Sequence, residues 1–457
     1  MKKSCFVLLF VAMFALIACN YNDSQVSVNT ADENQNVIVN GEVSLSRALT
    51  NADFVFKNTE ALDYKKRQVK SVDILTRANT RVCTFGSRSS QNDQEKPIAY
   101  VVNYENNDGF AILAADIHLP PVIGIGDEGN FNTDEFMAFI QNGGATRSSA
   151  NNDLNPAQAV QYAIVNNSLL LPPKDFGDVT ILGSDTTVML KCLPLVPTKW
   201  GQRDPYNYYA PPVENSDSVK KLAGCVPVAG AQVLASLCYH HNLRPTTQLS
   251  EEYPIDWNVI NRIIYEDTYK FVYGNRSAEA LAVASLIRAV GEDINANYGS
   301  SITTANTFNL ENTFRSLGIS NPKHGNASYN PPITNNDIFN MIVAYNYPVI
   351  AQATNSITGG DTHCFVLDGL LRLEYSLLFT NSEEIAPDIR SNLDNFQYNF
   401  DLVHINLGWN GQCDGYYLPD AFNLTEDKYR EYAEEHDIDT SSSYVFDMLV
   451  VYLIYGM

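Results

Sequence analysis

The spacing of apolar residues predicts strands early in the chain and a helix in its middle. Apolar runs at 98–104, 110–115 and 122–125 are separated by an Asn-Asp-Gly turn and a pair of prolines, as in short antiparallel strands. Residues 223–241 instead carry apolar side chains at helical spacing, and Asn242 follows as a stop signal.

The rest of the chain contains a less regular stretch and then further strands. Residues 145–190 combine a helix-like run at 156–163 with a Pro pair and a Gly-Ser pair, which indicates a linker between two units. Beyond the central helix, strand-like runs follow at 348–353, 364–370, 403–407 and 446–454. A helical part followed by a strand-rich part predicts an α+β fold.

Composition limits the possible partners. A chain of 457 residues that is 45% hydrophobic can form two or more cored domains. Its formal net charge of −22 opposes binding to phosphate backbones, so we expect no nucleic-acid partner. The sequence contains neither a CxxC pair nor an HExxH motif, and we therefore expect no structural or catalytic zinc site.

The N-terminus has the pattern of an export signal. Two lysines precede an apolar run at 6–17, which is too short to span a bilayer, and the run ends Leu-Ile-Ala-Cys19. This resembles a bacterial lipoprotein signal, whose cysteine receives lipid; an ordinary secretory signal with a chance cysteine is the alternative. We expect a signal peptide at 1–18, lipid on Cys19, a flexible tether at 19–45 and an exported, membrane-anchored protein on the outer membrane or cell surface.

Cys225 is the strongest candidate for a nucleophile. Gly224 and Cys225 open the central helix, where the positive end of the helix dipole stabilises a thiolate. Gly224 permits a sharp chain entry without a side chain over the sulfur. A buried structural cysteine is the alternative for this position.

His363 is the candidate base for this thiol. It follows Gly359-Gly360-Asp361-Thr362 and directly precedes an apolar strand-like run. It lies about 138 residues after Cys225, within the papain-like Cys-to-His spacing of roughly 130–150. A loop histidine without catalytic duty is the alternative.

Three further residues complete a possible acyl-transfer site. Asn406, at a strand end, could accept the imidazole N–H and orient the base, and Trp409 could shield that bond from water. Gln202 could donate to an oxyanion together with the Cys225 backbone N–H. A strand turn with a packing Trp, and an exposed loop Gln, are the alternatives.

Four motifs in this order resemble the streptopain-like family of papain-like cysteine peptidases. The motifs are Lys199 to Gln202 with Pro205 to Asn207, Gly224 to Gln232, His363 to Gly369, and His404 to Asn406 continuing to Gly415-Tyr416-Tyr417. Residues 100–126 are similar to the prodomain of the same family.

The resemblance implies a two-lobed papain-like catalytic domain at 191–457, preceded by a small α+β prodomain at 46–150 and a linker at 151–190. It also implies an endopeptidase that uses no cofactor and is made as an inhibited zymogen, whose prodomain holds the base away from the thiol. Protein or peptide substrates and the prodomain itself would be its partners, and maturation is expected between about residues 165 and 195. Leu407 departs from the family, which carries Trp there, and residues 371–402 form an unusually long insert.

Two other functions remain open at this point. A catalytically silent surface lipoprotein could bind host or matrix proteins with the same fold. A thiol amidase or transpeptidase could use the same residues on cell-wall peptides.

Overall fold

The structure is a computed structural model of the chain. It describes residues 41–60, 64–76, 81–84, 97–141, 155–171, 174, 179–265, 270–299, 302–325, 333–355, 362–381, 393–423, 430–431, 434 and 448–456. The predicted signal peptide, Cys19 and nearly all of the predicted tether lie outside these residues. Within them, no helix is long and apolar enough to cross a membrane.

The α-helices of the described residues are spread between residues 45 and 345. The α-helices are α1 (Leu45–Thr59), α2 (Thr133–Gln141), α3 (Pro156–Leu169), α4 (Cys225–His240), α5 (Trp257–Tyr265), α6 (Ala278–Asp293), α7 (Leu310–Ser316) and α8 (Asn335–Tyr345). Short 3-10 turns are η1 (Glu105–Asn107), η2 (Thr307–Asn309) and η4 (Pro419–Asn423).

Most strands belong to one large sheet. The strands are β1 (Val69–Thr76), β2 (Arg81–Thr84), β3 (Pro97–Tyr104), β4 (Phe110–Ala114), β5 (Val122–Gly126), β6 (Val179–Cys192), β7 (Pro212–Val213), β8 (Ser216–Lys220), β9 (Ser320–Gly325), β10 (Val349–Asn355), β11 (Thr362–Asn381), β12 (Leu393–Asn406), β13 (Gly415–Tyr417) and β14 (Met448–Gly456). Only β7 and β8 form a separate pair among the described strands.

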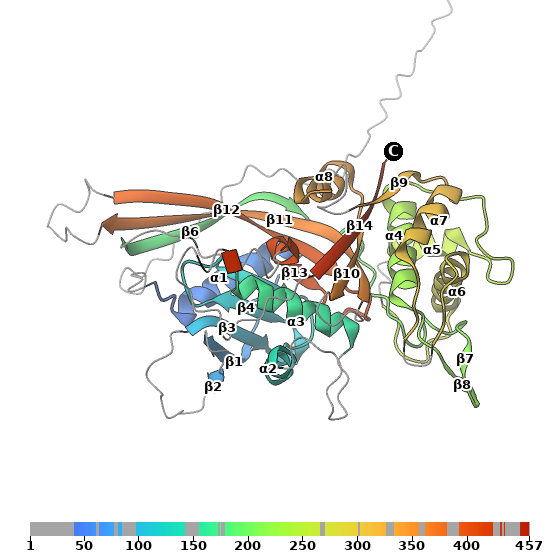
Figure 1. Cartoon of the computed structure of the whole chain (residues 1–457), viewed down its shortest axis with the longest axis horizontal. Helices are drawn as coiled ribbons and strands as arrows, with labels where there is room; N and C mark the ends of the chain where they lie inside the picture. Colours follow the sequence, from blue (N-terminus) through green and yellow to red (C-terminus); the bar gives the residue numbers. More distant parts are fainter. Residues whose placement is uncertain are drawn as a thin grey trace, which may run out of the picture.

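One sheet joins the N-terminal and C-terminal parts of the chain (Figure 1). Its order is β2-β1-β3-β4-β5-β13-β12-β11-β10-β14-β9, with β6 also paired to β11. The junction is the antiparallel pairing of β5 with β13, in which Gly126 lies opposite Gly415 and Gly124 opposite Tyr417. Helices α4, α5, α6 and α7 gather beyond one end of this sheet as a separate helical group. The mixed content confirms the α+β prediction.

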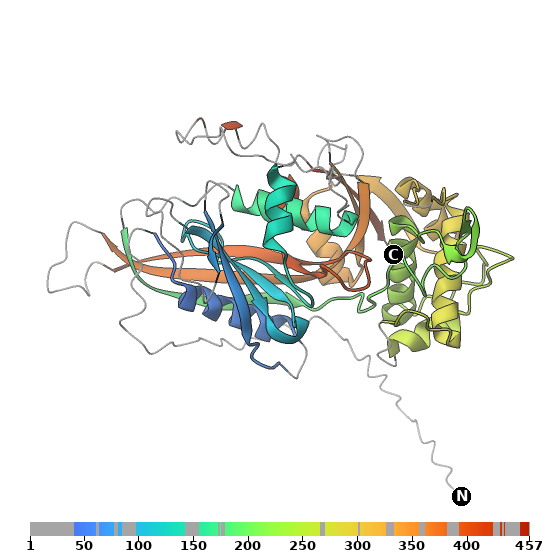
Figure 2. The ribbon, with the colours of Figure 1, turned by 90° about the horizontal axis from the view of Figure 1, so that it is seen from below.

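Figure 2 shows that α1 and α3 lie on opposite sides of the extended sheet. Asn155 caps α3 by accepting a hydrogen bond from the N–H of Gln158, and Pro156 occupies the first turn, where its missing N–H costs nothing. Most of α3 is buried, including its polar residues Gln161 and Asn167. The Gln161 amide donates to the Tyr417 hydroxyl at 2.8 Å, so α3 is tied to β13.

The early strands and the central helix agree closely with the sequence pattern. The runs expected at 98–104, 110–115 and 122–125 are β3, β4 and β5, each within two residues of the expected ends. The helix expected over 223–241 is α4, and Cys225 is its first residue.

The stretch interpreted as a linker contains regular structure. We expected a linker over 151–190 that contains a helix-like run at 156–163. That run is part of the mostly buried helix α3 (156–169), whereas the strand β6 (Val179–Cys192) was not expected. The Pro and Gly pairs suggested irregular chain. The strand β6 was missed because its pairing with β11, far along the chain, cannot be seen in a local pattern. The domain boundaries and the maturation site stay predictions.

The long insert at 371–402 continues the hairpin of β11 and β12. Its described residues pair with each other out to Thr380 opposite Leu393. The other edge of β11 pairs with β6 from Leu370 opposite Cys192 to Asn381 opposite Val179. The insert therefore supplies two strands of a three-stranded ribbon whose third strand comes from the predicted linker.

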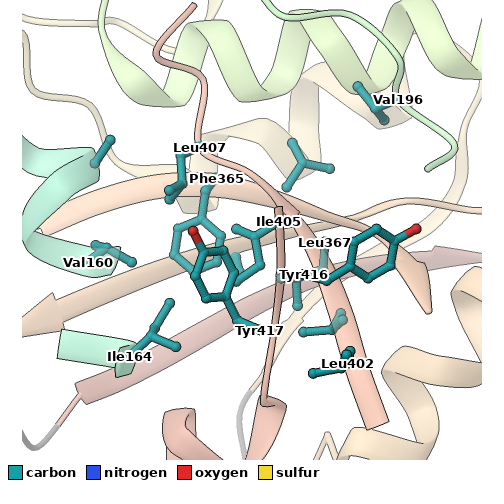
Figure 3. Close-up of a cluster of buried hydrophobic side chains, with 14 of the residues drawn as sticks. Val160, Ile164, Val196, Phe365, Leu367, Leu402, Ile405, Leu407, Tyr416 and Tyr417 are labelled. Carbon is teal, nitrogen blue, oxygen red and sulfur yellow. The ribbon is translucent and has the colours of Figure 1, made fainter. Parts of the chain in front are cut away.

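The core at the sheet junction combines residues from all these segments (Figure 3). Val160 and Ile164 of α3 face the rings of Phe365 and Tyr417, which lie next to Leu407 and Ile405. Phe365, Ile405, Leu407 and Tyr417 have no exposed surface. Burial of large apolar side chains contributes roughly 1.5–3 kcal/mol each, so this cluster holds α3 and β13 against β11 and β12.

The closeness of β5 and β13 makes Gly415 a sensitive position. A Cβ at residue 415 would lie 2.0 Å from the carbonyl oxygen of Ile125, a backbone atom that cannot move aside without breaking the pairing. We expect Gly415→Ala to lower the free energy of unfolding by about 1–3 kcal/mol. Gly183→Ala is the matched control, since a Cβ there would meet nothing within 4 Å. Circular dichroism during urea unfolding measures both; equal midpoints would show that this close approach does not support the junction.

Candidate active site

Cys225 lies where the sequence predicted, at the N-terminal end of α4. Gly224 precedes it with a φ of 95°, a left-handed conformation that glycine adopts without strain. A Cβ on Gly224 would lie 2.8 Å from Cγ2 of Thr303, so a larger residue would also collide with the facing loop. Cys225 as a residue is half-buried, and the helix dipole works in favour of the ionised form of its thiol.

Burial dominates the electrostatics of this thiol in the structure. It raises the pKa of Cys225, and backbone N–H groups of Cys364, Val226 and Cys225 offset the increase only in part. No imidazole contributes to the pKa of Cys225. At neutral pH the sulfur is therefore protonated in this arrangement and is a weak nucleophile.

His363 is buried at the start of β11, opposite Ala353 of β10. Its Nε2 lies 2.8 Å from the carbonyl oxygen of Leu407, and its Nδ1 is buried with no hydrogen-bond partner among the described residues. Burial lowers the pKa of His363 to about 4, although the Leu407 carbonyl works in the opposite direction. The ring is therefore neutral at pH 7, with Nε2 as its donor.

The alternation of side chains along β11 separates the candidate base from the candidate nucleophile. The thiol of Cys364 interacts with that of Cys225 and with the Thr307 hydroxyl. His363, one residue earlier, stacks with Phe365 at a centroid distance of 6.4 Å. Because successive side chains of a strand point to opposite faces, His363 lies on the face of β11 away from Cys225.

Asn406 does not orient His363 in this structure. Its side-chain nitrogen donates to the carbonyl of Thr198 at 2.6 Å, and its oxygen accepts from the Gln232 amide at 3.0 Å. The same oxygen accepts the N–H of Gly408 at 3.1 Å. The acceptor for the imidazole is instead the neighbouring Leu407 carbonyl. A fully buried amide takes the partners within reach, and β12 ends with Asn406 turned toward α4.

Trp409 is partly buried against the core, and its predicted shielding of an Asn–His bond has no counterpart in this arrangement. The ring that stacks near His363 is Phe365. Phe365 in turn stacks with Phe422 of η4 at 6.1 Å. The base is thus held among apolar rings, which explains its low pKa.

Gln202 lies near the nucleophile, as the oxyanion prediction requires. Gln202 is buried, and its backbone carbonyl accepts the N–H of Ala223, two residues before Cys225, at 2.9 Å. The exposed-loop alternative for Gln202 is therefore wrong.

The sequence reasoning missed two residues that organise the site. Gln232 on α4 accepts hydrogen bonds from the Thr198 hydroxyl at 3.0 Å and the Trp200 N–H at 3.1 Å, so it joins the nucleophile helix to the segment bearing Gln202. Asp414 accepts the N–H of Leu407 at 2.7 Å and thereby fixes the carbonyl that holds His363. A polar residue inside an otherwise apolar helix was a visible signal for Gln232; Asp414 had none.

Burial also acts on Asp414. It raises the pKa of this carboxyl to about 7, with the Leu407 N–H opposing the increase.

Among the described residues no group of three or more His, Cys, Asp or Glu is arranged to hold a metal ion.

A cysteine at the start of α4, a histidine at the start of β11 and a buried Gln whose backbone bonds two residues before the cysteine are the groups that a thiol hydrolase uses. Residues 200–417 match the model of the peptidase C10 family, and residues 42–142 match that of the Spi protease inhibitors. Residues 200–417 are therefore a peptidase C10 domain, and residues 42–142 are a Spi-type inhibitory prodomain that precedes it.

Two solved structures from Prevotella intermedia are similar to this chain. One is a mutant prointerpain A fragment, with 19% identity, coverage of 79% of this chain and 96% of that one, and a TM-score of 0.44. The other is the active wild-type interpain A cysteine protease, with 21% identity, coverage of 58% and 96%, and a TM-score of 0.37. No curated protein sequence matches the chain.

The raised pKa of Cys225 leads to a labelling prediction. Iodoacetamide near pH 6 should modify Cys225 slowly in the precursor, and at least about tenfold faster after maturation pairs it with an imidazole, because only the thiolate reacts. Cys238 is the internal control, since burial raises its pKa to about 12. Peptide mapping by mass spectrometry measures the rates; equally fast labelling of Cys225 in both forms would contradict the assignment.

Proposed function

We propose that this C10 peptidase is an endopeptidase that cleaves protein substrates through a Cys225 thioester. The observation that supports this most directly is the position of Cys225, at the first residue of α4 behind a left-handed glycine. His363 is the general base and acid, and Gln202 with the Cys225 N–H holds the oxyanion. Asn406 orients His363 in the matured enzyme.

The reaction balances without a cofactor. His363 takes the thiol proton, and Cys225 Sγ attacks the peptide carbonyl to form a tetrahedral oxyanion. Collapse breaks the C–N bond, the leaving amine takes the proton from His363, and a thioester remains. Water, deprotonated by His363, then attacks the thioester and releases the acid and the free thiol.

The described arrangement supports an inactive precursor. A protonated thiol and a neutral imidazole on opposite faces of β11 cannot exchange a proton. Maturation must therefore turn His363 toward Cys225. This movement breaks the 2.8 Å bond to the Leu407 carbonyl and leaves the neighbouring Asn406 amide as the oriented acceptor.

Substitution of the nucleophile tests the proposal. Cys225→Ala and His363→Ala should each reduce casein cleavage by about 10⁴-fold or more, because the two residues act as a unit. Gln202→Ala should cost about 10²–10³-fold, the usual loss for one oxyanion donor. Asn406→Ala should reduce activity less, but it leaves buried partners unsatisfied and should also destabilise the fold by about 1–3 kcal/mol.

Each variant is assayed on muropeptides as well as on casein. Circular dichroism checks that each variant is folded. If Cys225→Ala loses muropeptide cleavage and the wild-type protein does not cleave casein, the amidase alternative is favoured. A folded Cys225→Ala protein that cleaves casein at the wild-type rate would exclude a cysteine peptidase. Absence of both casein and muropeptide cleavage by the matured wild-type protein would favour the binding lipoprotein.

The pairing of β6 with β11 supports a proposal for the position of the maturation cut. Because Val179–Cys192 completes a three-stranded ribbon with β11 and β12, we propose that β6 stays with the catalytic part. Sequencing of the new N-terminus should find it before Val179. An active enzyme that begins after Cys192 would contradict this.

We also propose that the protein is exported and anchored through lipid on Cys19. The support is the Leu-Ile-Ala-Cys19 sequence at the end of the apolar run. Cys19→Ala should move the protein from the membrane fraction to the soluble fraction, as followed by fractionation and immunoblotting. Membrane attachment that survives Cys19→Ala would refute the anchor.

A further inference from the structure

A buried histidine joins the inhibitory prodomain to the catalytic domain. His404 of β12 is 3% exposed and lies between two carboxylates. Its Nδ1 is 2.6 Å from Asp368 Oδ1, and its Nε2 is 3.1 Å from Asp127 Oδ2. Asp368 belongs to the catalytic domain, whereas Asp127 directly follows β5 of the prodomain.

These contacts require a charged imidazolium. Two carboxylates accept from the two ring nitrogens, so both nitrogens must carry a proton. Burial alone lowers the pKa of His404, but Asp368 and Asp127 outweigh it and raise the pKa to about 10. Burial raises the pKa of Asp127, yet His404 and Lys199 bring it below its ordinary value.

The next residue of the prodomain makes a second set of contacts. Glu128 Oε1 lies 3.3 Å from the Lys199 ammonium and 3.1 Å from that of Lys270, both in the catalytic domain. The backbone N–H of Asp127 also donates to the carbonyl of Asp414 at 2.9 Å. Two consecutive acidic residues thus meet one buried, one half-buried and one exposed cation at the end of the β5–β13 pairing.

We propose that Asp127 and Glu128 are the recognition element that holds this prodomain on the catalytic domain, and that the lifetime of the inhibited precursor depends on them. The surface that they fit, His404 with Lys199 and Lys270 beside the edge of β13, selects a strand followed by two acidic residues. This inference rests on the proposed peptidase function. It adds the side chains by which the prodomain is retained.

The two acidic residues differ in what their loss exposes. Loss of the Asp127 charge leaves a buried imidazolium with one carboxylate instead of two, whereas Glu128 pairs with cations that water can solvate. Asp127 is therefore the stronger contact. Glu128 contributes mainly through charge complementarity, which a reversal of sign tests more sharply than a deletion.

The experiment follows precursor activation in the full-length protein. Asp127→Asn keeps the shape and removes the charge, and it should shorten the half-time for appearance of peptidase activity by about tenfold. Glu128→Lys should also shorten it, and Glu128→Lys combined with Lys270→Glu should restore it in part. Glu105→Gln removes an exposed acidic group of the same prodomain and should leave the half-time unchanged.

A second measurement separates retention of the prodomain from general instability. Enzyme matured from the Asp127→Asn precursor should have the wild-type kcat/KM and melting temperature, because Asp127 is no longer attached to it. In a Cys225→Ala background, which blocks self-processing, Asp127→Asn should lower the melting temperature of the precursor. Asp368→Asn should lower it in both forms, since Asp368 stays with His404.

The effect on the Cys225→Ala precursor should also depend on pH. The groups that face His404 are Asp127, Asp368, the Tyr416 ring and, through charge, Asp414, while Lys199 acts on Asp127. A raised histidine pKa adds stability that is complete below its unfolded value of 6.5 and is lost as pH rises through about 10. The difference in melting temperature between the Asp127→Asn precursor and its parent should therefore be larger at pH 6 than at pH 10.

The outcomes of the two proposals can be distinguished. If the wild-type protein never develops Cys225-dependent activity, the proposed function fails. If that activity appears but Asp127→Asn and Glu128→Lys activate no faster than Glu105→Gln, the peptidase assignment stands and the recognition element is refuted.

Discussion

The alternation of side chains along β11 is the constraint on which the site depends. Residues 363 and 364 are neighbours, yet only one of them can face α4 and the Cys225 thiol. In the described register Cys364 takes that place, and His363 turns into an apolar pocket. The register is set by β10 on one edge and β12 on the other. A single strand therefore decides whether nucleophile and base can meet.

The surroundings of the two groups strengthen this separation. Burial raises the pKa of the thiol and lowers that of the imidazole, so both groups are neutral at pH 7. An ion pair between them would require the two to be close, because isolated buried charges are costly. His404 shows the opposite case, since two carboxylates keep its ring charged in an equally buried place. Within the same sheet, His363 is therefore neutral at pH 7 and His404 is charged.

The continuous sheet explains how a segment far from Cys225 can affect the site. β5 of the prodomain pairs with β13, and Asp127 at its end bonds to Asp414 through the backbone. Asp414 holds the Leu407 N–H, and the Leu407 carbonyl holds His363. Each contact is a hydrogen bond between buried groups, which are expensive to leave unpaired. Removal of the prodomain therefore releases one end of a chain of contacts that reaches the base.

Local patterns in the sequence determined the strands β3 to β5, the helix α4 with Cys225 at its start, and the family to which the chain belongs, because periodicity and short motifs need only neighbouring residues. The position of Gln202 beside α4 also agreed with expectation. Tertiary structure alone decided that residues 179–192 form the strand β6, that Asn406 bonds to Gln232, and that Asp127 reaches His404. These contacts join residues 174 to 277 positions apart. Their partners are chosen by burial, which leaves each polar group only the partners that packing brings within reach, and no local pattern carries that information.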